Sequence, residues 1–192
     1  GYIGPNFLDK DIIDNCLSTM SNRGPDSKGY TINNFGNLNI YLFHTRLSII
    51  DLSKKSEQPI KNNLGSLVYN GEIYNFKELL NKLTNKTNIN SDTILLVELW
   101  SEFGEKCLEW LEGMYAFTIY DKKEKKIISV RDPFGVKPLY YKFSNNVFYF
   151  CSEIEPILNA EKPNLRSIKS YLSSEYYENI EETFFENIFK VK

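Results

Sequence analysis

The chain has 192 residues and a formal net charge of −2, a length that fits one domain with a sizeable core. Hydrophobic residues make up 42% and charged residues 25%, which predicts a packed globule rather than a disordered chain. The one basic run, KKEKK at 122–126, lies between apolar stretches, and no stretch approaches the ~20 apolar residues of a membrane span. These features argue against nucleic acid and membranes as partners.

Apolar residues recur at the helical period in three segments. The first covers residues 10–20 and follows Asp9, a candidate N-cap. The second is carried by Phe76 and Leu79, and the third runs from Leu95 to Phe103. We therefore expect three helices.

Six segments rich in β-branched and aromatic residues predict strands. They are 38–50, 66–69, 114–121, 125–132, 138–143 and 147–153. Short polar turns separate the last four, which are expected to form an antiparallel meander. Strands with segregated helices predict an α+β domain.

Several kinds of chemistry are excluded by what the sequence lacks. No two glycines are adjacent or one residue apart, which excludes a Rossmann fingerprint. His44 is the only histidine, so a zinc site is not expected, and on an apolar strand it is more typical of a core residue than of a catalytic base. The cysteines, Cys16, Cys107 and Cys151, are odd in number and lie in apolar patterns, which predicts reduced core thiols in a cytoplasmic protein.

The stretch YNGEIYN at 69–75 has two interpretations. An Asn-Gly pair suits a type I′ hairpin, but few residues then remain before the helical period begins at Phe76. A strand-to-helix corner fits better. At such a corner the Gly71 N–H and the Asn70 side-chain NH₂ would form a pair of donors for an oxyanion.

Three charged residues have ordinary interpretations when each is taken alone. Asp92 suits a helix N-cap, Arg46 a salt bridge at the rim of a strand, and Glu72 a solvated surface. Together with an oxyanion pair they complement a free α-amino acid whose side chain ends in a reactive carbonyl. A guanidinium binds a carboxylate bidentately, and carboxylates accept hydrogen bonds from an ammonium.

Eight motifs resemble, in order and spacing, the glutamine amidotransferase domain of glutamine-dependent asparagine synthetases. They are SNRGPDSKG (21–29), HTRLSIIDLS (44–53), EQPI (57–60), YNGEIYNF (69–76), SDT (91–93), LEGMYAFTIYD (111–121), RDPFGVKPLYY (131–141) and CSEIEPIL (151–158). The resemblance implies a class II amidotransferase of the N-terminal-nucleophile hydrolase fold, a four-layer αββα sandwich of two antiparallel sheets between helices. It assigns residues 1–160 to this domain and residues 161–192 to a connector toward a C-terminal synthetase domain.

The resemblance also implies an activity and a set of site residues. Such domains hydrolyse L-glutamine to glutamate and ammonia for the ATP-dependent amidation of an acceptor carboxylate, most commonly aspartate. The expected site combines substrate-binding residues with an oxyanion hole. Arg46 binds the substrate α-carboxylate beside the backbone of Ile49 and Ile50, Glu72 and Asp92 hold the ammonium, and Asn70 and Gly71 form the oxyanion hole.

The family's nucleophile is an N-terminal cysteine whose own α-amino group, with a reference pKa of ~7.7–8.0, serves as the base. Family chains open with this cysteine and the present chain opens with GYIG, so we expect the nucleophile immediately before Gly1. None of the three cysteines present has a free amine. The alternative is a catalytically inactive glutamine-binding or regulatory domain that lacks the N-terminal cysteine.

The remaining expectations concern cofactors and partners. The resemblance implies no metal and no cofactor in this domain, and ATP and magnesium in the synthetase domain. The partners expected are L-glutamine, the synthetase domain in cis and a second copy in a homodimer.

Overall fold

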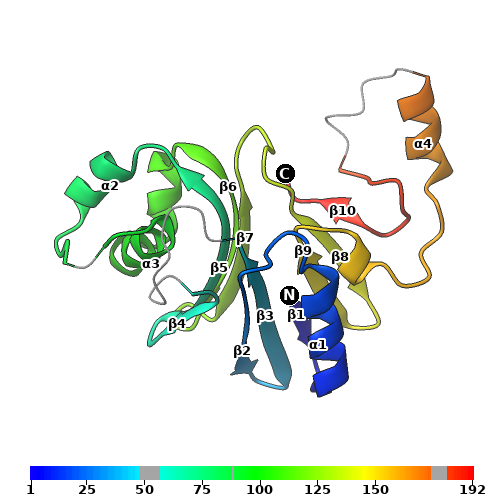
Figure 1. The fold of residues 1–192 in the computed structure, drawn as a ribbon, viewed down its shortest axis with the longest axis horizontal. Coiled ribbons are helices and arrows are strands. Elements are labelled where there is room, and N and C mark those ends of the chain that lie inside the picture. Colours follow the sequence, from blue (N-terminus) through cyan, green and yellow to red (C-terminus); the bar gives the residue numbers. More distant parts are fainter. Residues whose placement is uncertain (48–56, 88, 174–180) are drawn as a thin grey trace.

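The computed structural model describes residues 1–47, 57–87, 89–173 and 181–192. Two antiparallel sheets form the centre of the fold (Figure 1). Sheet A has the strand order β10-β8-β9-β1-β3-β2, and sheet B has the order β4-β5-β6-β7.

The bounds of the elements are as follows. Sheet A contains β1 (Tyr2–Gly4), β2 (Ser27–Phe35), β3 (Leu38–Arg46), β8 (Tyr140–Ser144), β9 (Val147–Cys151) and β10 (Phe189–Lys190). Sheet B contains β4 (Ile60–Asn62), β5 (Gly65–Ile73), β6 (Gly113–Asp121) and β7 (Lys126–Arg131). The α-helices are α1 (Lys10–Thr19), α2 (Phe76–Lys82), α3 (Asp92–Phe103) and α4 (Leu165–Leu172), and the 3₁₀ helices are η2 (Gly104–Trp110) and η3 (Glu155–Ile157).

Three apolar clusters separate four layers. Leu79 of α2 and Leu95 of α3 pack on the outer face of sheet B, where they share one cluster with Phe117. Ile40, Leu42, Tyr120 and Phe150 fill the space between the two sheets. Ile13 and Leu17 of α1 pack on the outer face of sheet A against Tyr2 and Tyr41. The order is helices, sheet B, sheet A, helix (Figure 1), which confirms the predicted αββα sandwich.

All three predicted helices are present, as α1, α2 and α3. Asp9 occupies the N-cap position of α1, but its side chain makes no capping hydrogen bond. Among the described residues no helix is both long and apolar enough to cross a membrane. The strands β1, β2 and β4 and the helix α4 are additions that the hydrophobic pattern did not predict. In β2, SKGYTINNF, polar residues interrupt the alternation, and the strand is defined by its pairing with the whole of β3.

The predicted four-stranded meander is wrong, because its two hairpins belong to different sheets. β6 pairs with β7 in sheet B, whereas β8 pairs with β9 in sheet A. Between them the Asp132 carboxylate accepts hydrogen bonds from the N–H groups of Val136 and Lys137, both at 2.9 Å, and Arg131 Nε donates to the Lys137 carbonyl at 2.8 Å. These local bonds stabilise the crossover, and hydrophobic periodicity carries no signal for them.

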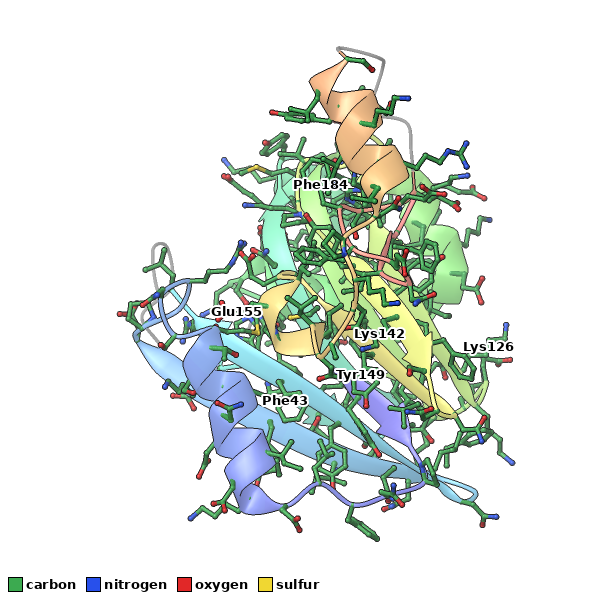
Figure 2. The ribbon with its side chains drawn as sticks, turned by 90° about the vertical axis from the view of Figure 1, so that its right-hand side faces the viewer. Phe43, Lys126, Lys142, Tyr149, Glu155 and Phe184 are labelled. Carbon is green, nitrogen blue, oxygen red and sulfur yellow. The ribbon has the colours of Figure 1, made fainter. Side chains whose placement is uncertain are left out.

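A buried lysine connects the β8–β9 hairpin to the segment that follows it. Lys142 lies directly opposite Tyr149 in the pairing of β8 with β9, and its Nζ is 5.6 Å from the ring centroid (Figure 2). The same Nζ donates to the Ile157 carbonyl at 3.2 Å and forms an ion pair with Glu161. Lys142 is therefore a structural cation. Strand β10 lies in the segment 161–192 and pairs with β8, which precedes that segment. The role of the segment as a connector stays a prediction.

Candidate active site

The stretch Tyr69–Ile73 is part of strand β5 and does not form a turn. Asn70 pairs with Ala116 of β6 and Gly71 pairs with Tyr115, so the hairpin interpretation is wrong. The strand-to-helix corner exists, but it lies at residues 74–75, between the end of β5 and the start of α2. Nine residues of β6 pair with β5, and this tertiary pairing overrides the turn preference of Asn-Gly.

Gly71 is required here by close packing. A Cβ atom at this position would lie 2.3 Å from the Met114 carbonyl oxygen of β6. A side chain would therefore push the two strands apart.

The backbone N–H of Gly71 points away from β6. Tyr115, directly opposite, uses both of its backbone groups on Asp132: its carbonyl accepts from the Asp132 N–H at 2.8 Å, and its N–H donates to Asp132 Oδ2 at 3.3 Å. Opposed residues of an antiparallel pair either exchange both bonds or point both groups outward. The Gly71 N–H therefore faces the other edge of β5.

On that edge the N–H groups on both sides of Gly71 have acceptors. The Tyr69 N–H donates to Gln58 Oε1 at 2.6 Å, and the Ile73 N–H donates to Asp92 Oδ2 at 2.8 Å. The Gly71 N–H between them has no acceptor among the described residues. A preset donor is thus left for a ligand atom at the position predicted for the oxyanion hole.

Asn70 and Glu72 lie on the face of β5 that is turned toward sheet A. Side chains alternate between the two faces of a strand. Ser66, on the same face, exchanges hydrogen bonds with Asn33 of β2, at 3.0 Å for Asn33 Nδ2 to Ser66 Oγ. The amide of Asn70 and the carboxylate of Glu72 therefore project toward β3.

On the facing strand, β3 directs Arg46 toward sheet B. His44 Nε2 contacts the Tyr69 carbonyl of β5 at 3.2 Å, which shows that this face of β3 meets β5. Arg46, two residues further on, shares that face. The guanidinium and the groups at positions 70 and 72 consequently project into the same space between the sheets.

The motif at 21–29 supports the end of β3. The Asp26 N–H donates to the Arg46 carbonyl at 3.0 Å. A Cβ at Gly24 would lie 2.3 Å from the Thr45 carbonyl carbon, so a glycine is needed for this close approach. The backbone of Arg46 is thus held independently of its side chain.

Asp92 is not the N-cap of its helix. Ser91 is the N-cap of α3, and its Oγ accepts from the Ile94 N–H at 3.4 Å. Asp92 Oδ2 instead accepts from the Ile73 N–H and, at 3.4 Å, from the Tyr69 hydroxyl.

The electrostatics around Asp92 favour a bound cation. Burial raises the pKa of Asp92, the hydrogen bonds from Ile73 and Tyr69 oppose that shift, and the negative charge of Glu72 adds to it. Burial and the Asp92 carboxylate raise the pKa of Tyr69, which keeps its hydroxyl protonated as a donor. Two carboxylates close enough to repel each other are stabilised by an ammonium placed between them.

His44 is neutral at pH 7. Burial lowers its pKa to about 4, although the contact with the Tyr69 carbonyl opposes this shift. Because a carbonyl only accepts, Nε2 carries the proton and donates it to Tyr69. His44 therefore supports β5, in keeping with its interpretation as a core residue.

The structure thus gathers Asn70, Gly71, Glu72 and Asp92 at one end of β5 and places Arg46 on the facing strand. Ile49 and Ile50 lie outside the described residues. Sequence reasoning missed the support that Gln58 gives to β5, because its partner is eleven residues away and no local pattern marks the contact.

A hollow of about 270 Å³ lies beside α4. Its Glu182 accepts hydrogen bonds from Asn164 Nδ2 and Ser167 Oγ, both at 3.1 Å. These side chains serve the packing of α4, and none of the predicted site residues lines this hollow.

Comparison with known proteins gives a consistent result. The family description "Glutamine amidotransferase domain" matches residues 1–192. A Methanocaldococcus jannaschii protein with the name "Putative asparagine synthetase [glutamine-hydrolyzing] 2" is 39% identical over 171 residues, which are 81% of this chain and 33% of that protein. Asparagine synthetase 1 (glutamine-hydrolysing) of Bacillus subtilis is 33% identical over 175 residues, 87% of this chain and 27% of that protein. The chain thus spans a third or less of the length of these relatives.

Solved structures show the same fold. The glutamine phosphoribosylpyrophosphate amidotransferase of B. subtilis superimposes with a TM-score of 0.64 at 22% identity, over 81% of this chain and 42% of that one. A structure described as the allosteric regulatory enzyme of purine biosynthesis superimposes with a TM-score of 0.63 at 22% identity, over the same shares of the two chains.

Proposed function

Because this chain belongs to the glutamine amidotransferase domain family, we propose that it binds L-glutamine and hydrolyses the side-chain amide to glutamate and ammonia. One observation carries the proposal. The Gly71 N–H faces outward from β5 between two N–H groups that already have acceptors, next to the amide of Asn70. Two fixed donors of this kind stabilise the oxyanion that forms when an amide is attacked.

The charged residues suit the amino-acid end of glutamine. Arg46 would bind the α-carboxylate, and Glu72 and Asp92 would accept hydrogen bonds from the ammonium. Their placement supports these roles, because Arg46 projects from β3 toward sheet B and Glu72 projects from β5 toward sheet A. The ligand would then lie across the gap between the sheets.

In the proposed reaction, the thiol of a cysteine preceding Gly1 attacks the amide carbon, and its proton passes to the cysteine's own α-amine. Asn70 and Gly71 donate to the resulting oxyanion. The C–N bond then breaks, ammonia leaves with the transferred proton, and water hydrolyses the thioester to glutamate and the free thiol. In the register of β1 with β3, a residue before Gly1 would lie opposite Phe43, on the strand that carries Arg46.

We further propose that the ammonia supplies an ATP-dependent synthetase domain of the same protein. The relatives named above are glutamine-hydrolysing asparagine synthetases and are at least three times as long as the matched segment. Aspartate is then the first acceptor to test, and ATP and magnesium would bind outside residues 1–160, with residues 161–192 as the connector. Localisation in the cytoplasm and assembly as a homodimer belong to the same proposal.

The test uses the protein with its native start. Glutamate release from glutamine should be measured together with covalent labelling by a diazoketone analogue of glutamine. Replacing the preceding cysteine by alanine should abolish both while glutamine still binds. Binding without turnover in the unaltered protein would favour the inactive glutamine-binding domain, and absence of binding would refute both functions.

A further inference from the structure

Gln58 lies opposite Tyr69 in an extension of the β4–β5 pairing. Ile60 of β4 pairs with Leu67 of β5, and two more steps in the same register bring Gln58 beside Tyr69. The backbone pairing of the two strands ends at Ile60, before this point.

The side chain of Gln58 takes the place of the missing backbone bonds. Its Oε1 accepts from the Tyr69 N–H at 2.6 Å, and its Nε2 donates to the Tyr69 carbonyl at 3.0 Å. A primary amide matches both groups at once because it carries a donor and an acceptor in one plane, as a peptide group does. Gln58 therefore fixes both peptide planes that flank the Tyr69 Cα.

Gln58 is itself held from two directions. Its Nε2 lies 3.4 Å from Thr93 Oγ1, in the turn of α3 that begins with Asp92. Its backbone carbonyl oxygen lies against β2, where a Cβ at Gly29 would be only 2.5 Å from it. The backbone of Gln58 thus contacts sheet A, while its side-chain amide contacts α3.

The Tyr69 carbonyl belongs to the peptide that joins Tyr69 to Asn70. Fixing that peptide fixes the direction in which the Asn70 side chain leaves the strand and the plane of the next peptide, which carries the Gly71 N–H. Displacement of a reacting group by about 1 Å costs on the order of 10²-fold in rate.

We propose that Gln58 is a positioning residue for the oxyanion hole: its amide clamps the backbone of Tyr69 and thereby sets the two donors at Asn70 and Gly71. This role rests on the proposed glutaminase function. Gln58 acts only through Tyr69 and takes no part in binding the amino-acid end of glutamine.

The kinetic test compares Gln58→Met, which keeps the length of the side chain without its polar atoms, with Lys61→Met in the exposed part of β4 as the control. In the full-length protein with its native start, Gln58→Met should lower kcat for glutamine hydrolysis by about 10- to 100-fold and leave KM within about twofold. Lys61→Met should change neither. An unchanged kcat, or a change confined to KM, would overturn the proposal.

A double-variant cycle separates positioning from general weakening of the fold. In the Asn70→Ala background, Gln58→Met should cause a clearly smaller loss of kcat than it does alone, because one of the donors that it positions is already gone. If Gln58→Met lowers kcat by the same factor in both backgrounds, Gln58 acts independently of the oxyanion hole.

Amide hydrogen exchange tests the hydrogen bonds between Gln58 and the Tyr69 backbone without requiring catalytic turnover. In Gln58→Met the Tyr69 amide should exchange at least about tenfold faster, while the amides of β6 keep their protection. If the unaltered protein releases no glutamate, the proposed function fails, and the exchange result still decides whether the clamp exists. Unchanged exchange at Tyr69 would refute it.

Discussion

Asp92 Oδ2 accepts the backbone N–H of Ile73 at 2.8 Å, a bond that joins the first residue of α3 to the last residue of β5. One carboxylate therefore satisfies an edge N–H of the strand and also brings negative charge to the proposed ammonium site. The two roles are separable, because a neutral amide oxygen accepts the same hydrogen bond without the charge.

Asp92→Asn should weaken glutamine binding and leave the fold intact. Loss of a charge-assisted hydrogen bond of about 1.5–3 kcal/mol raises KM by on the order of 10- to 100-fold. Asp92→Ala should raise KM similarly and also lower the free energy of unfolding by about 1–3 kcal/mol, because the Ile73 N–H loses its acceptor. Steady-state kinetics and urea denaturation measure the two effects.

Glu98→Gln, six residues further along α3, is the matched control and should leave KM unchanged. Equal unfolding free energies for Asp92→Asn and Asp92→Ala would show that the bond to Ile73 contributes nothing to stability.

Asn70→Ala should lower kcat by on the order of 10²–10³ with little change in KM, because a side chain that donates to the oxyanion acts mainly in the transition state. Asn63→Ala, in the exposed turn between β4 and β5, provides the control for loss of an amide. A rise in KM at constant kcat would place Asn70 in ground-state binding instead.

Arg46→Met should raise KM for glutamine by on the order of 10- to 100-fold, through loss of a charged hydrogen-bond pair with the α-carboxylate. The bond from the Asp26 N–H to the Arg46 carbonyl does not involve the side chain and should remain. Arg23→Met removes an exposed ion pair with Glu153 and should have almost no effect. If kcat fell and KM did not change, Arg46 would have a role in the chemical step.

The residues that the sequence predicted well are those whose neighbours are fixed by periodicity. Leu79 and Leu95 follow the helical period, and both lie in the helices that it predicts and pack on sheet B. In these cases the local pattern and the tertiary structure require the same arrangement.

Interpretations of single residues or short stretches failed where a long-range partner decides the conformation. Asn70-Gly71 has the composition of a tight turn, yet nine residues of β6 hold it in a strand. Aspartate is a residue type favoured at N-caps, yet Ser91 is the N-cap here. The Asp92 carboxylate instead accepts a hydrogen bond from the N–H of Ile73, nineteen residues away. No window of sequence contains both partners, so the support of the site could be found only in three dimensions.

The stability of the protein should depend on pH through His44. Its pKa is about 4 in the fold and 6.5 in the absence of burial, so between these values the unfolded chain binds more protons than the folded one. The free energy of unfolding should therefore fall as the pH drops from about 6.5 toward 4, by at most about 1.4 kcal/mol per pH unit from this group. Above pH 6.5 the contribution is complete and constant.

His44→Gln isolates this contribution, because a glutamine keeps an N–H donor for the Tyr69 carbonyl and does not titrate. Carboxylates such as Asp92 also titrate below pH 6.5, but they do so in both proteins and cancel in the difference. Urea denaturation at pH 4.5, 5.5 and 7 should show the unaltered protein losing stability relative to His44→Gln as the pH falls. A difference that stays constant across these pH values would mean that His44 binds protons equally in the folded and unfolded chains, so that burial does not lower its pKa in the fold.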